Sequence, residues 1–374
     1  MTPLRDNGYY VNTLKLIAQV KLVTTPEQAD ALKRTLQAAN AVCDSISAWA
    51  WENQTFGQYP LHRAQYAVQR VESGLTAQVI VRCIGKVADA YKLDRATQRF
   101  FQPLGSLAFD DRILKWYVDR GEVSIWTVDG RKKIPFVCGE HQRGLLAFRQ
   151  GESDIAFVDG AFYLLATVSI PDPPLIETNG VLGVDLGIVN IAVDSDGNRY
   201  SGDPIKSCRR RRREHRRGLQ KCGSKRSKRT LKQVGRKVSR FSKWVNHNIS
   251  KAIVQTALVS RKAIALESLK GIRERASAWN REMRWQMGNW AFDELARFIV
   301  YKAKRAGVPV VFVDPRNTSR TCSVCGHCDK ANRRNQAQFV CLSCGFQGNA
   351  DENAARNLEA RGAVTHPIFV AACG

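Results

Sequence analysis

Apolar and polar residues alternate near the start of the chain, from Asn12 to Thr24. This period of two predicts a β-strand with one buried face. The apolar positions of that face are Leu14, Leu16, Ala18, Val20 and Leu22. After Pro26, apolar residues recur every three or four positions, which predicts a helix with the proline in its first turn. A further helical tract runs from Leu75 to Tyr91, so we expect residues 25–103 to form a helical insert.

Beyond Pro103 the pattern returns to short runs rich in β-branched and aromatic residues, separated by Gly, Asp and Pro. Together with the first strand, these runs predict one β-barrel, with residues 1–24 and 104–175 as its two parts. A proline-rich stretch ends this region as a stiff linker and contains Pro171, Pro173 and Pro174.

A different pattern begins at Val181, where two or three strands joined by tight turns precede a long basic tract. Strands and helices then alternate. We expect a buried strand from Ala263 to Leu266, a helix from Trp285 to Arg305, and a buried strand from Val308 to Val313. Apolar strands of this kind are covered by helices on both faces. The whole chain is therefore predicted to be a multidomain α/β protein.

The 374 residues include 58 Lys and Arg against 34 Asp and Glu, which gives a formal net charge of +24. This excess predicts a polyanionic partner, and nucleic acid fits it best. A membrane is the weaker alternative, because neither end carries a basic amphipathic helix and no apolar run is long enough to span a bilayer. The first residues also lack the pattern of a secretory signal, so we expect a soluble, cytoplasmic protein.

Three carboxylates stand where packing does not explain them. Asp185 ends the apolar strand VLGVD, Glu267 ends the strand that begins at Ala263, and Asp351 starts a helix. Each has a structural alternative as a turn former, a surface charge or a helix cap, respectively. Together, their order is that of an RNase H-like nuclease, whose acids converge on two Mg²⁺ or Mn²⁺ ions. Other acids near strand ends fit turns and are read as structural: Asp194, Asp196 and Asp314.

Four of the eleven cysteines form two Cys-x-x-Cys pairs near the carboxyl end: Cys322, Cys325, Cys341 and Cys344. Fifteen residues separate the inner cysteines, and this spacing is typical of one tetrahedral zinc ion with four thiolate ligands. Because four thiolates leave no open position, the predicted zinc is structural. Cys328 is either free or an alternative ligand. The scattered cysteines, among them Cys43 and Cys83, are read as small hydrophobic residues.

The basic residues concentrate between Lys206 and Lys243, which holds 18 Lys and Arg and one acid, Glu214. Partial helical spacing of its apolar residues predicts a helical hairpin that contacts a nucleic-acid duplex; a solvated face or disordered tail is the alternative. Trp279 and Trp285 lie among arginines and are candidate lid or base-stacking residues. The expected nucleic-acid contacts, including two between the cysteine pairs, are Arg209, Arg210, Arg211, Arg212, Arg213, Arg216, Arg217, Lys225, Arg226, Lys228, Arg229, Arg333 and Arg334.

Several segments, read in order, resemble the TnpB family of transposon-encoded RNA-guided DNA nucleases and its relatives, the type V CRISPR effectors. These segments are GVDLG, LESLKG, YKAKRAGVPVVFVDPRNTSRTCSVCG, CLSCGF and NADENAARNL. The resemblance implies a RuvC nuclease domain at 181–315 and 349–374, with Asp185, Glu267 and Asp351 as its metal-binding catalytic acids. It also implies a zinc ribbon for target nucleic acid at 316–348, and a wedge barrel with a helical recognition insert in the N-terminal half.

By the same resemblance, the partners are a noncoding guide RNA and a double-stranded DNA target, recognised through a short adjacent motif and guide pairing. The expected enzyme is a Mg-dependent DNA endonuclease that contains structural zinc and acts as a monomer in its ribonucleoprotein. Two alternatives stay open. One is a guide-independent transposase or DNA-binding accessory protein, and the other is an RNA-guided DNA binder that does not cut.

Overall fold

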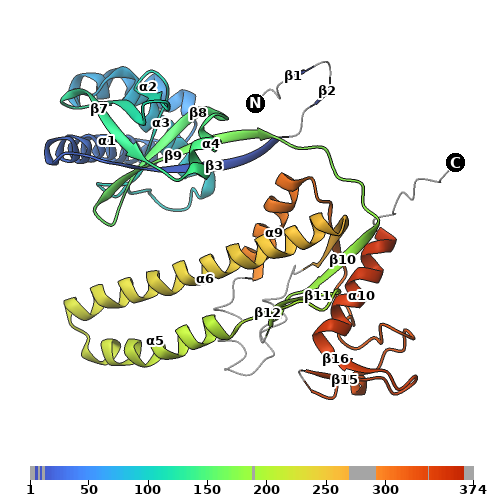
Figure 1. The fold of residues 1–374 in the computed structure, drawn as a ribbon. Helices are drawn as coiled ribbons and strands as arrows, with labels where there is room; N and C mark the ends of the chain where they lie inside the picture. The colour runs from blue at the N-terminus through green and yellow to red at the C-terminus, as the bar shows by residue number, and fades with distance from the viewer. Residues whose placement is uncertain are drawn as a thin grey trace. The chain divides into compact units, whose positions relative to one another are not determined.

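The computed structural model describes residues 5–6, 9–10, 13–187, 190–268, 292–335 and 337–365. The chain forms two compact units, Met1–Pro171 and Asp172–Gly374 (Figure 1). Trp279 and Trp285, the candidate lid residues, lie outside the described residues. No helix among the described residues is both long and apolar enough to cross a membrane.

The first unit is built on a seven-stranded antiparallel sheet with the order β4-β8-β9-β3-β7-β6-β5. The predicted alternation of β3 is confirmed, since Val20 is 1% exposed and Ile17 is 65% exposed. Among the described residues, β4 and β5 end the order without pairing to each other, so the expected barrel is a near-barrel sheet that hydrogen bonds do not close. The strands are β3 (Thr13–Leu22), β4 (Leu107–Phe109), β5 (Leu114–Tyr117), β6 (Glu122–Thr127), β7 (Gly130–Val137), β8 (Arg149–Val158) and β9 (Ala161–Pro171), with β1 (Arg5–Asp6) and β2 (Tyr9–Tyr10) in a separate pair.

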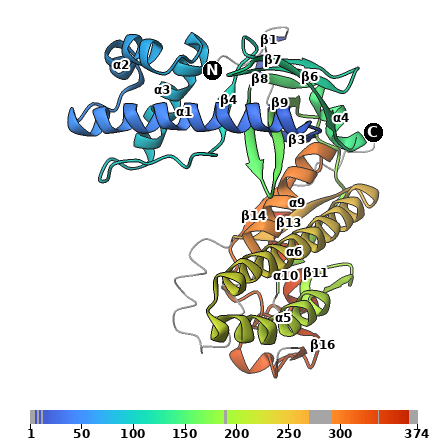
Figure 2. The ribbon, with the colours of Figure 1, turned by 90° about the vertical axis from the view of Figure 1, so that its left-hand side faces the viewer.

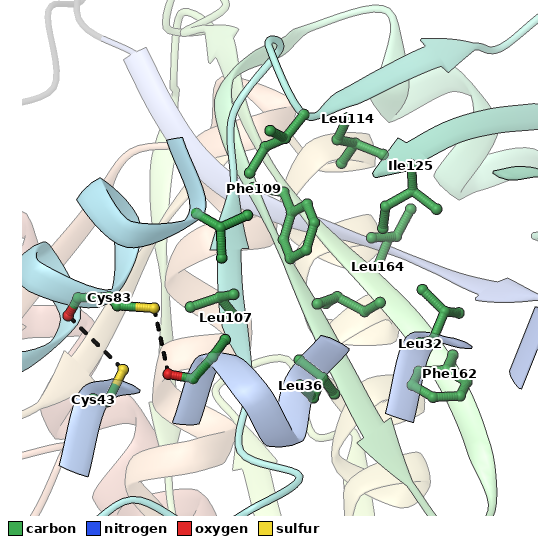
Figure 3. Packing of buried hydrophobic residues seen from close by; sticks show 14 of the residues in the cluster. Leu32, Leu36, Cys43, Cys83, Leu107, Phe109, Leu114, Ile125, Phe162 and Leu164 are labelled. Atoms are coloured by element: carbon green, nitrogen blue, oxygen red, sulfur yellow. Dashed lines mark hydrogen bonds between the residues drawn. The ribbon is translucent and has the colours of Figure 1, made fainter. Parts of the chain in front are cut away.

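Three helices lie between β3 and β4 in the sequence. A reciprocal cap starts the first of them, because Thr25 Oγ1 accepts from the Gln28 N–H at 3.3 Å and Gln28 Oε1 accepts from the Thr25 N–H at 3.0 Å. Leu32 and Leu36 then pack into one core with sheet residues such as Phe109 (Figure 3). The helices are α1 (Pro26–Glu52), α2 (Gln58–Glu72) and α3 (Ala77–Leu93), and a short α4 (Glu140–Leu146) precedes β8.

Cys43 on α1 and Cys83 on α3 are fully buried in this core (Figure 3). Each thiol contacts a backbone carbonyl of the opposite helix, with Cys43 Sγ 3.9 Å from Cys83 O and Cys83 Sγ 3.4 Å from Ala39 O. Their predicted role as small buried hydrophobic residues is confirmed.

The second unit contains a five-stranded sheet with the order β12-β11-β10-β13-β14. The neighbours β10, β13 and β14 are parallel, whereas β11 and β12 are antiparallel additions at one side. The elements are β10 (Gly180–Asp185), β11 (Asn190–Asp194), β12 (Arg199–Ser201), α5 (Asp203–Cys222), α6 (Lys225–Val259), β13 (Lys262–Glu267), α9 (Phe292–Ala306), β14 (Val310–Val313), the 3-10 turn η2 (Lys330–Asn332), β15 (Gln338–Val340), β16 (Gln347–Asn349) and α10 (Ala350–Thr365).

Helices cover both faces of this sheet, as its apolar strands predict. Leu182 and Leu266 point into a core shared with α6 and α9, whereas Ala265 on the other face packs toward α10. The approach of α10 is close, since a Cβ on Gly183 would lie 2.0 Å from Ala355 O. The packing of α10 on β10 therefore requires glycine at position 183, where any side chain would clash with the helix backbone.

Two predicted ranges differ from the structure. The strand expected from Val308 begins at Val310, and it is not fully buried because β14 is an edge strand on which Phe312 is 53% exposed. The helix expected from Trp285 is described from Phe292 onward, and its first predicted residues lie outside the described part. The helical hairpin predicted for the basic tract is confirmed as α5 and α6, which run side by side in both views (Figures 1 and 2).

Candidate functional site

Asp185 and Glu267 occupy equivalent places on neighbouring parallel strands. The register pairs Val184 of β10 with Leu266 of β13, and each of these residues is followed directly by its acid. Carboxyl ends of parallel strands meet at one edge of a sheet, where ligands bind in open α/β folds. Asp351 joins them from the first turn of α10, the helix that covers β10, and is 7% exposed.

The three carboxylates interact electrostatically. The pKa of Asp185 is raised well above its usual range by burial and then by the negative charges of Glu267 and Asp351, while Arg333 opposes the shift. One guanidinium beside three acids leaves an excess of negative charge, and that excess is costly unless a further cation shares the site. Hard oxygen donors of this kind suit Mg²⁺ or Mn²⁺, so the donor set fits the predicted divalent ions.

Asp351 is held by three side chains that the sequence did not assign to it. Asn190 Nδ2 donates to its Oδ2 at 3.1 Å, and Arg333 Nη2 lies 3.5 Å from its Oδ1. Asn349 Oδ1 accepts the backbone N–H of Asp351 at 2.9 Å, so Asn349 provides the helix cap that Asp351 alone was considered for. Asn349 stands two residues before Asp351, and that spacing is the one local feature that points to the cap.

The competing acids have structural partners. Asp194 is fully buried and accepts from the Asn198 N–H at 2.8 Å, while Asp196 forms an ion pair with Lys262. Asp314 accepts from the Arg316 N–H at 3.0 Å, as a turn residue does. These contacts agree with the structural reading of all three acids.

The four cysteines form a second candidate centre. Their sulfur atoms all lie within 4.8 Å of one another, and the Cys322–Cys344 and Cys325–Cys341 sulfur pairs are 3.7 and 3.5 Å apart. Two sulfurs bound to one tetrahedral zinc at about 2.3 Å would be about 3.8 Å apart, so the spacing fits such an ion. Among the described residues, no other group of three or more such side chains is gathered so closely, the three acids included.

The local contacts favour a thiolate at Cys341 and not at Cys344. Hydrogen bonding by the Cys344 N–H is the main cause that lowers the pKa of Cys341 to about 6. At Cys344 the Phe346 N–H lowers the pKa, but hydrogen bonds with the sulfur atoms of Cys325, Cys341 and Cys322 outweigh it and raise the pKa to about 12. Cys328 is exposed and lies outside the group of four, although it bridges to Thr321. The cysteine ribbon, residues 316–348, thus gathers the four predicted cysteines and leaves Cys328 apart.

Eleven of the thirteen residues predicted as nucleic-acid contacts lie on α5 and at the start of α6, and the other two, Arg333 and Arg334, lie in the cysteine ribbon. Gly223 allows the sharp turn between the two helices with a φ of 66°, and Ser224 caps α6 by accepting the Ser227 N–H. Arg209 lies in α5, but its side chain is outside the described part. Arg333 is half-buried beside Asp351 and Arg334 is exposed. The exposed members on the hairpin are Arg210, Arg211, Arg213, Arg216, Arg217, Lys225, Arg226, Lys228 and Arg229, while Arg212 is half-buried.

These features define the second unit as an α/β protein with a sheet-edge acid cluster, a four-cysteine ribbon and a basic helical hairpin. Two family models match within it, the first of them beginning at residue 165 near the end of the first unit. Residues 165–265 match a family described as "Probable transposase" (OrfB_IS605), and residues 292–358 match the Cas12f1-like TNB domain. Asp185 falls in the first match, and Asp351 with the four cysteines falls in the second.

Over these regions the chain is similar in sequence to Cas12f and TnpB proteins, the family that its motifs resemble. It is 34% identical over 205 residues to the CRISPR-associated endodeoxyribonuclease Cas12f1 of Sulfoacidibacillus thermotolerans, a match that covers 50% of this chain and 47% of that protein. It is 36% identical over 112 residues to a TnpB-like protein of Methanocaldococcus jannaschii, which covers 30% of this chain and 40% of the relative. The matches thus span about half the length of these relatives or less.

Two solved structures share the fold. A Cas12f1 chain in complex with sgRNA and target DNA superposes with a TM-score of 0.61 at 15% identity, covering 90% of this chain and 83% of that one. The mini-RNA-guided endonuclease CRISPR-Cas_phi3 gives a TM-score of 0.61 at 10% identity, covering 96% of this chain and 94% of that one. At these identities the likeness concerns the fold.

Proposed function

We propose that this protein is an RNA-guided DNA endonuclease of a transposable element, with Asp185, Glu267 and Asp351 as its catalytic acids. The observation that carries the proposal is the convergence of these three carboxylates at one sheet edge, where the charges of Glu267 and Asp351 help raise the pKa of Asp185. Arg333 is one positive charge among three acids, and the remaining repulsion has no stabilising role without a further cation. Cation binding is therefore the reason we assign to the cluster.

The acids would hold Mg²⁺ or Mn²⁺, which stabilise charge on the attacking and leaving oxygens of a phosphodiester during hydrolysis. Asp185 and Glu267 would offer oxygens from rigid strand ends, and Asp351 from the helix on the sheet. Asn190 and Asn349 orient Asp351, because one donates to its carboxylate and the other caps its backbone. The cysteine ribbon would hold a structural zinc and contribute to target binding.

The proposed partners follow from charge and from the relatives. Relatives carry the name CRISPR-associated endodeoxyribonuclease, and one structure with this fold contains sgRNA and target DNA. We propose a noncoding guide RNA and a double-stranded DNA target for this chain, with the hairpin of α5 and α6 on the nucleic acid. We further assign the wedge barrel to residues 1–24 and 104–175, the recognition insert to 25–103, and the RuvC-like domain to 181–315 and 349–374. The complex would act in the cytoplasm with one copy of the chain.

A guide-independent transposase, or a DNA-binding accessory protein, is the second candidate. One observation favours it, since the family that matches residues 165–265 is described as a transposase. An RNA-guided binder that does not cut is a third, but it leaves the retained acid cluster without a role.

The decisive experiment expresses the protein with its native flanking DNA and sequences the RNA that stays bound. We expect one discrete RNA that ends in sequence from outside the element. The purified complex should then cut a plasmid carrying the matching target in Mg²⁺, and Asp185→Ala should not. Heterogeneous RNA that salt removes would support the guide-independent reading. A discrete RNA without cutting would support the binder.

A further inference from the structure

Helix α10 carries two buried amide side chains on one face, Asn353 and Asn357, spaced one helical turn apart. They are 1% and 8% exposed. Buried amide side chains are stable where their hydrogen bonds are satisfied. A buried amide with its partners therefore specifies one arrangement of the chain around it. Neither residue is part of the acid cluster or of the cysteine group. The hydrogen-bond partners of Asn353 and Asn357 show which segment they hold in place.

Both amides bind the segment from Thr318 to Ser323, which leads into the first cysteine pair. Asn357 Nδ2 donates to Thr318 O at 2.8 Å and to Thr321 O at 2.7 Å. Asn353 Nδ2 donates to Thr321 O at 2.7 Å, and its Oδ1 accepts the Ser323 N–H at 2.9 Å. Cys322 lies between these two bonded residues, so the first cysteine pair is fastened to α10.

The other end of the cysteine ribbon is fastened to the same helix. Strand β16 follows Cys344 and runs directly into α10. At this junction the Ala350 N–H donates to Ala337 O at 3.0 Å, and Asn349 caps the N–H of Asp351. Both ends of the ribbon therefore meet at the first turns of α10, where Asp351 stands.

We propose that Asn353 and Asn357 are positioning residues that make the placement of Asp351 depend on the metal state of the four cysteines. A metal ion bound by the thiolates fixes Cys322, and the two amides pass that constraint to α10. Without the ion the segment from Thr318 to Ser323 loosens, and the first turn of α10 loses its support. The proposal rests on the proposed function only in taking Asp351 as a ligand of the divalent cation.

The first test uses the wild-type full chain with its thiolate site loaded with Co²⁺ or emptied by a thiol-selective mercurial and chelator. The rate of hydrogen exchange at the backbone amides of Asp351 and Glu352 measures how stably the first turn of α10 is held. Binding of Mn²⁺, measured by its spin resonance signal after subtraction of an Asp185→Asn sample, reads the acid cluster. Emptying the thiolate site should speed the exchange and weaken Mn²⁺ binding about ten-fold, the low end for lost outer-shell contacts.

The second test asks whether the amides carry the coupling. In Asn353→Ala and Asn357→Ala the cobalt–thiolate absorption should persist, while Mn²⁺ binding falls about ten-fold even with the thiolate site loaded. Emptying that site should then cause little further loss. Arg356→Ala, an exposed change on the same helix, is the matched control and should behave as wild type.

The outcomes separate the coupling from the proposed function. Mn²⁺ binding and hydrogen exchange that ignore the thiolate metal in the wild type overturn the coupling and leave the nuclease site intact. Faster exchange on metal removal without any Mn²⁺ binding at the acids supports the coupling and overturns the proposed function. Variants that still respond to metal removal by the full wild-type factor exclude the two asparagines as its carriers. The wild-type measurements need no variant, so they decide the coupling even where a variant fails to fold.

Discussion

Val184 and Leu266 are direct neighbours on the parallel strands β10 and β13, and each is followed by an acid at the same edge of the sheet. This register, together with the close packing of α10 on β10, brings residues 185, 267 and 351 into one electrostatic cluster. The acids come from separate parts of the chain, so the sheet and its covering helix must form before the cluster exists. The cluster should therefore respond to changes in charge as a unit.

The first prediction concerns catalysis. Glu267→Gln should reduce target cleavage by about 10²–10³-fold or more, the scale for removing one electrostatic contributor, while binding of guide and target stays within a few fold. Plasmid cleavage and a gel-shift assay on the same complex check this. Asp196→Asn, which removes a surface ion pair with Lys262, is the control and should retain activity. Undiminished cutting by Glu267→Gln would exclude that residue.

The second prediction concerns stability without divalent cations. A raised pKa means that Asp185 stabilises the fold in its protonated form, below its ordinary value of 3.8, and that this stability is lost as pH rises through the raised pKa. At neutral pH the ionised carboxylate lowers the free energy of unfolding. Asp185→Asn should therefore raise the melting temperature in EDTA. The gain should be about 2–4 °C per kcal/mol relieved. Added Mg²⁺ should stabilise the wild type more than the variant, and equal responses would contradict the assignment.

The third prediction separates the cysteines. Cys341→Ser removes one of four gathered thiols, and loss of a structural metal should cost more than about 3 kcal/mol of unfolding free energy. Cys328→Ser should stay within about 0.5 kcal/mol, because Cys328 is exposed and outside the group. Metal analysis of the purified proteins accompanies urea unfolding. If both variants lost the metal alike, Cys328 would belong to the site.

The fourth prediction concerns Lys302 on α9, which donates to Ser250 Oγ at 2.7 Å and to the backbone of α6. Burial, followed by the charge of Lys251, lowers its pKa from 10.5 to about 8. The stability linked to this shift is present above pH 10.5 and lost as pH falls through about 8. The unfolding free energy of the wild type should thus rise relative to Lys302→Met between these two values. Urea titrations at several pH values test this, and a pH-independent difference would refute it.

The fifth prediction concerns the basic hairpin. Replacing Arg216 and Arg217, both exposed on α5, with Gln should lower the slope of log affinity against log salt by about 1.4–1.8, if each meets one phosphate. Arg297→Gln on α9 also removes an exposed charge and should leave the slope unchanged. Filter binding over a range of salt concentrations gives the slope. Equal effects from both helices would indicate a diffuse charge and no defined contact surface.

Local pattern carried much of the fold. The alternation in β3, the helical spacing after Pro26 and the hairpin in the basic tract all appear as predicted, because each depends on residues close in sequence. The cysteine group was equally readable, since its spacing alone suggests one ion.

Features that depend on distant pairing were not readable. The edge position that exposes Phe312 and the open ends of the first sheet follow from strand order, which periodicity does not encode. The same holds for Asn190, which meets Asp351 across 161 positions of the chain. Arg333 was expected only on nucleic acid, yet it lies beside Asp351.

Both ends of the cysteine ribbon contact the same short part of α10. Asn353 donates a hydrogen bond to Thr321 at the start of the ribbon, and β16 at its end leads directly into α10. A segment whose two ends are held together can be lengthened between them at a small cost in free energy, because doubling a flexible loop costs only about 0.6 kcal/mol. Residues 329–331 are exposed and precede the buried Asn332 between the two cysteine pairs. They are therefore where this architecture can accept added sequence, and with it new recognition surface, while Arg333 and Ala337 keep their contacts with Asp351 and Ala350.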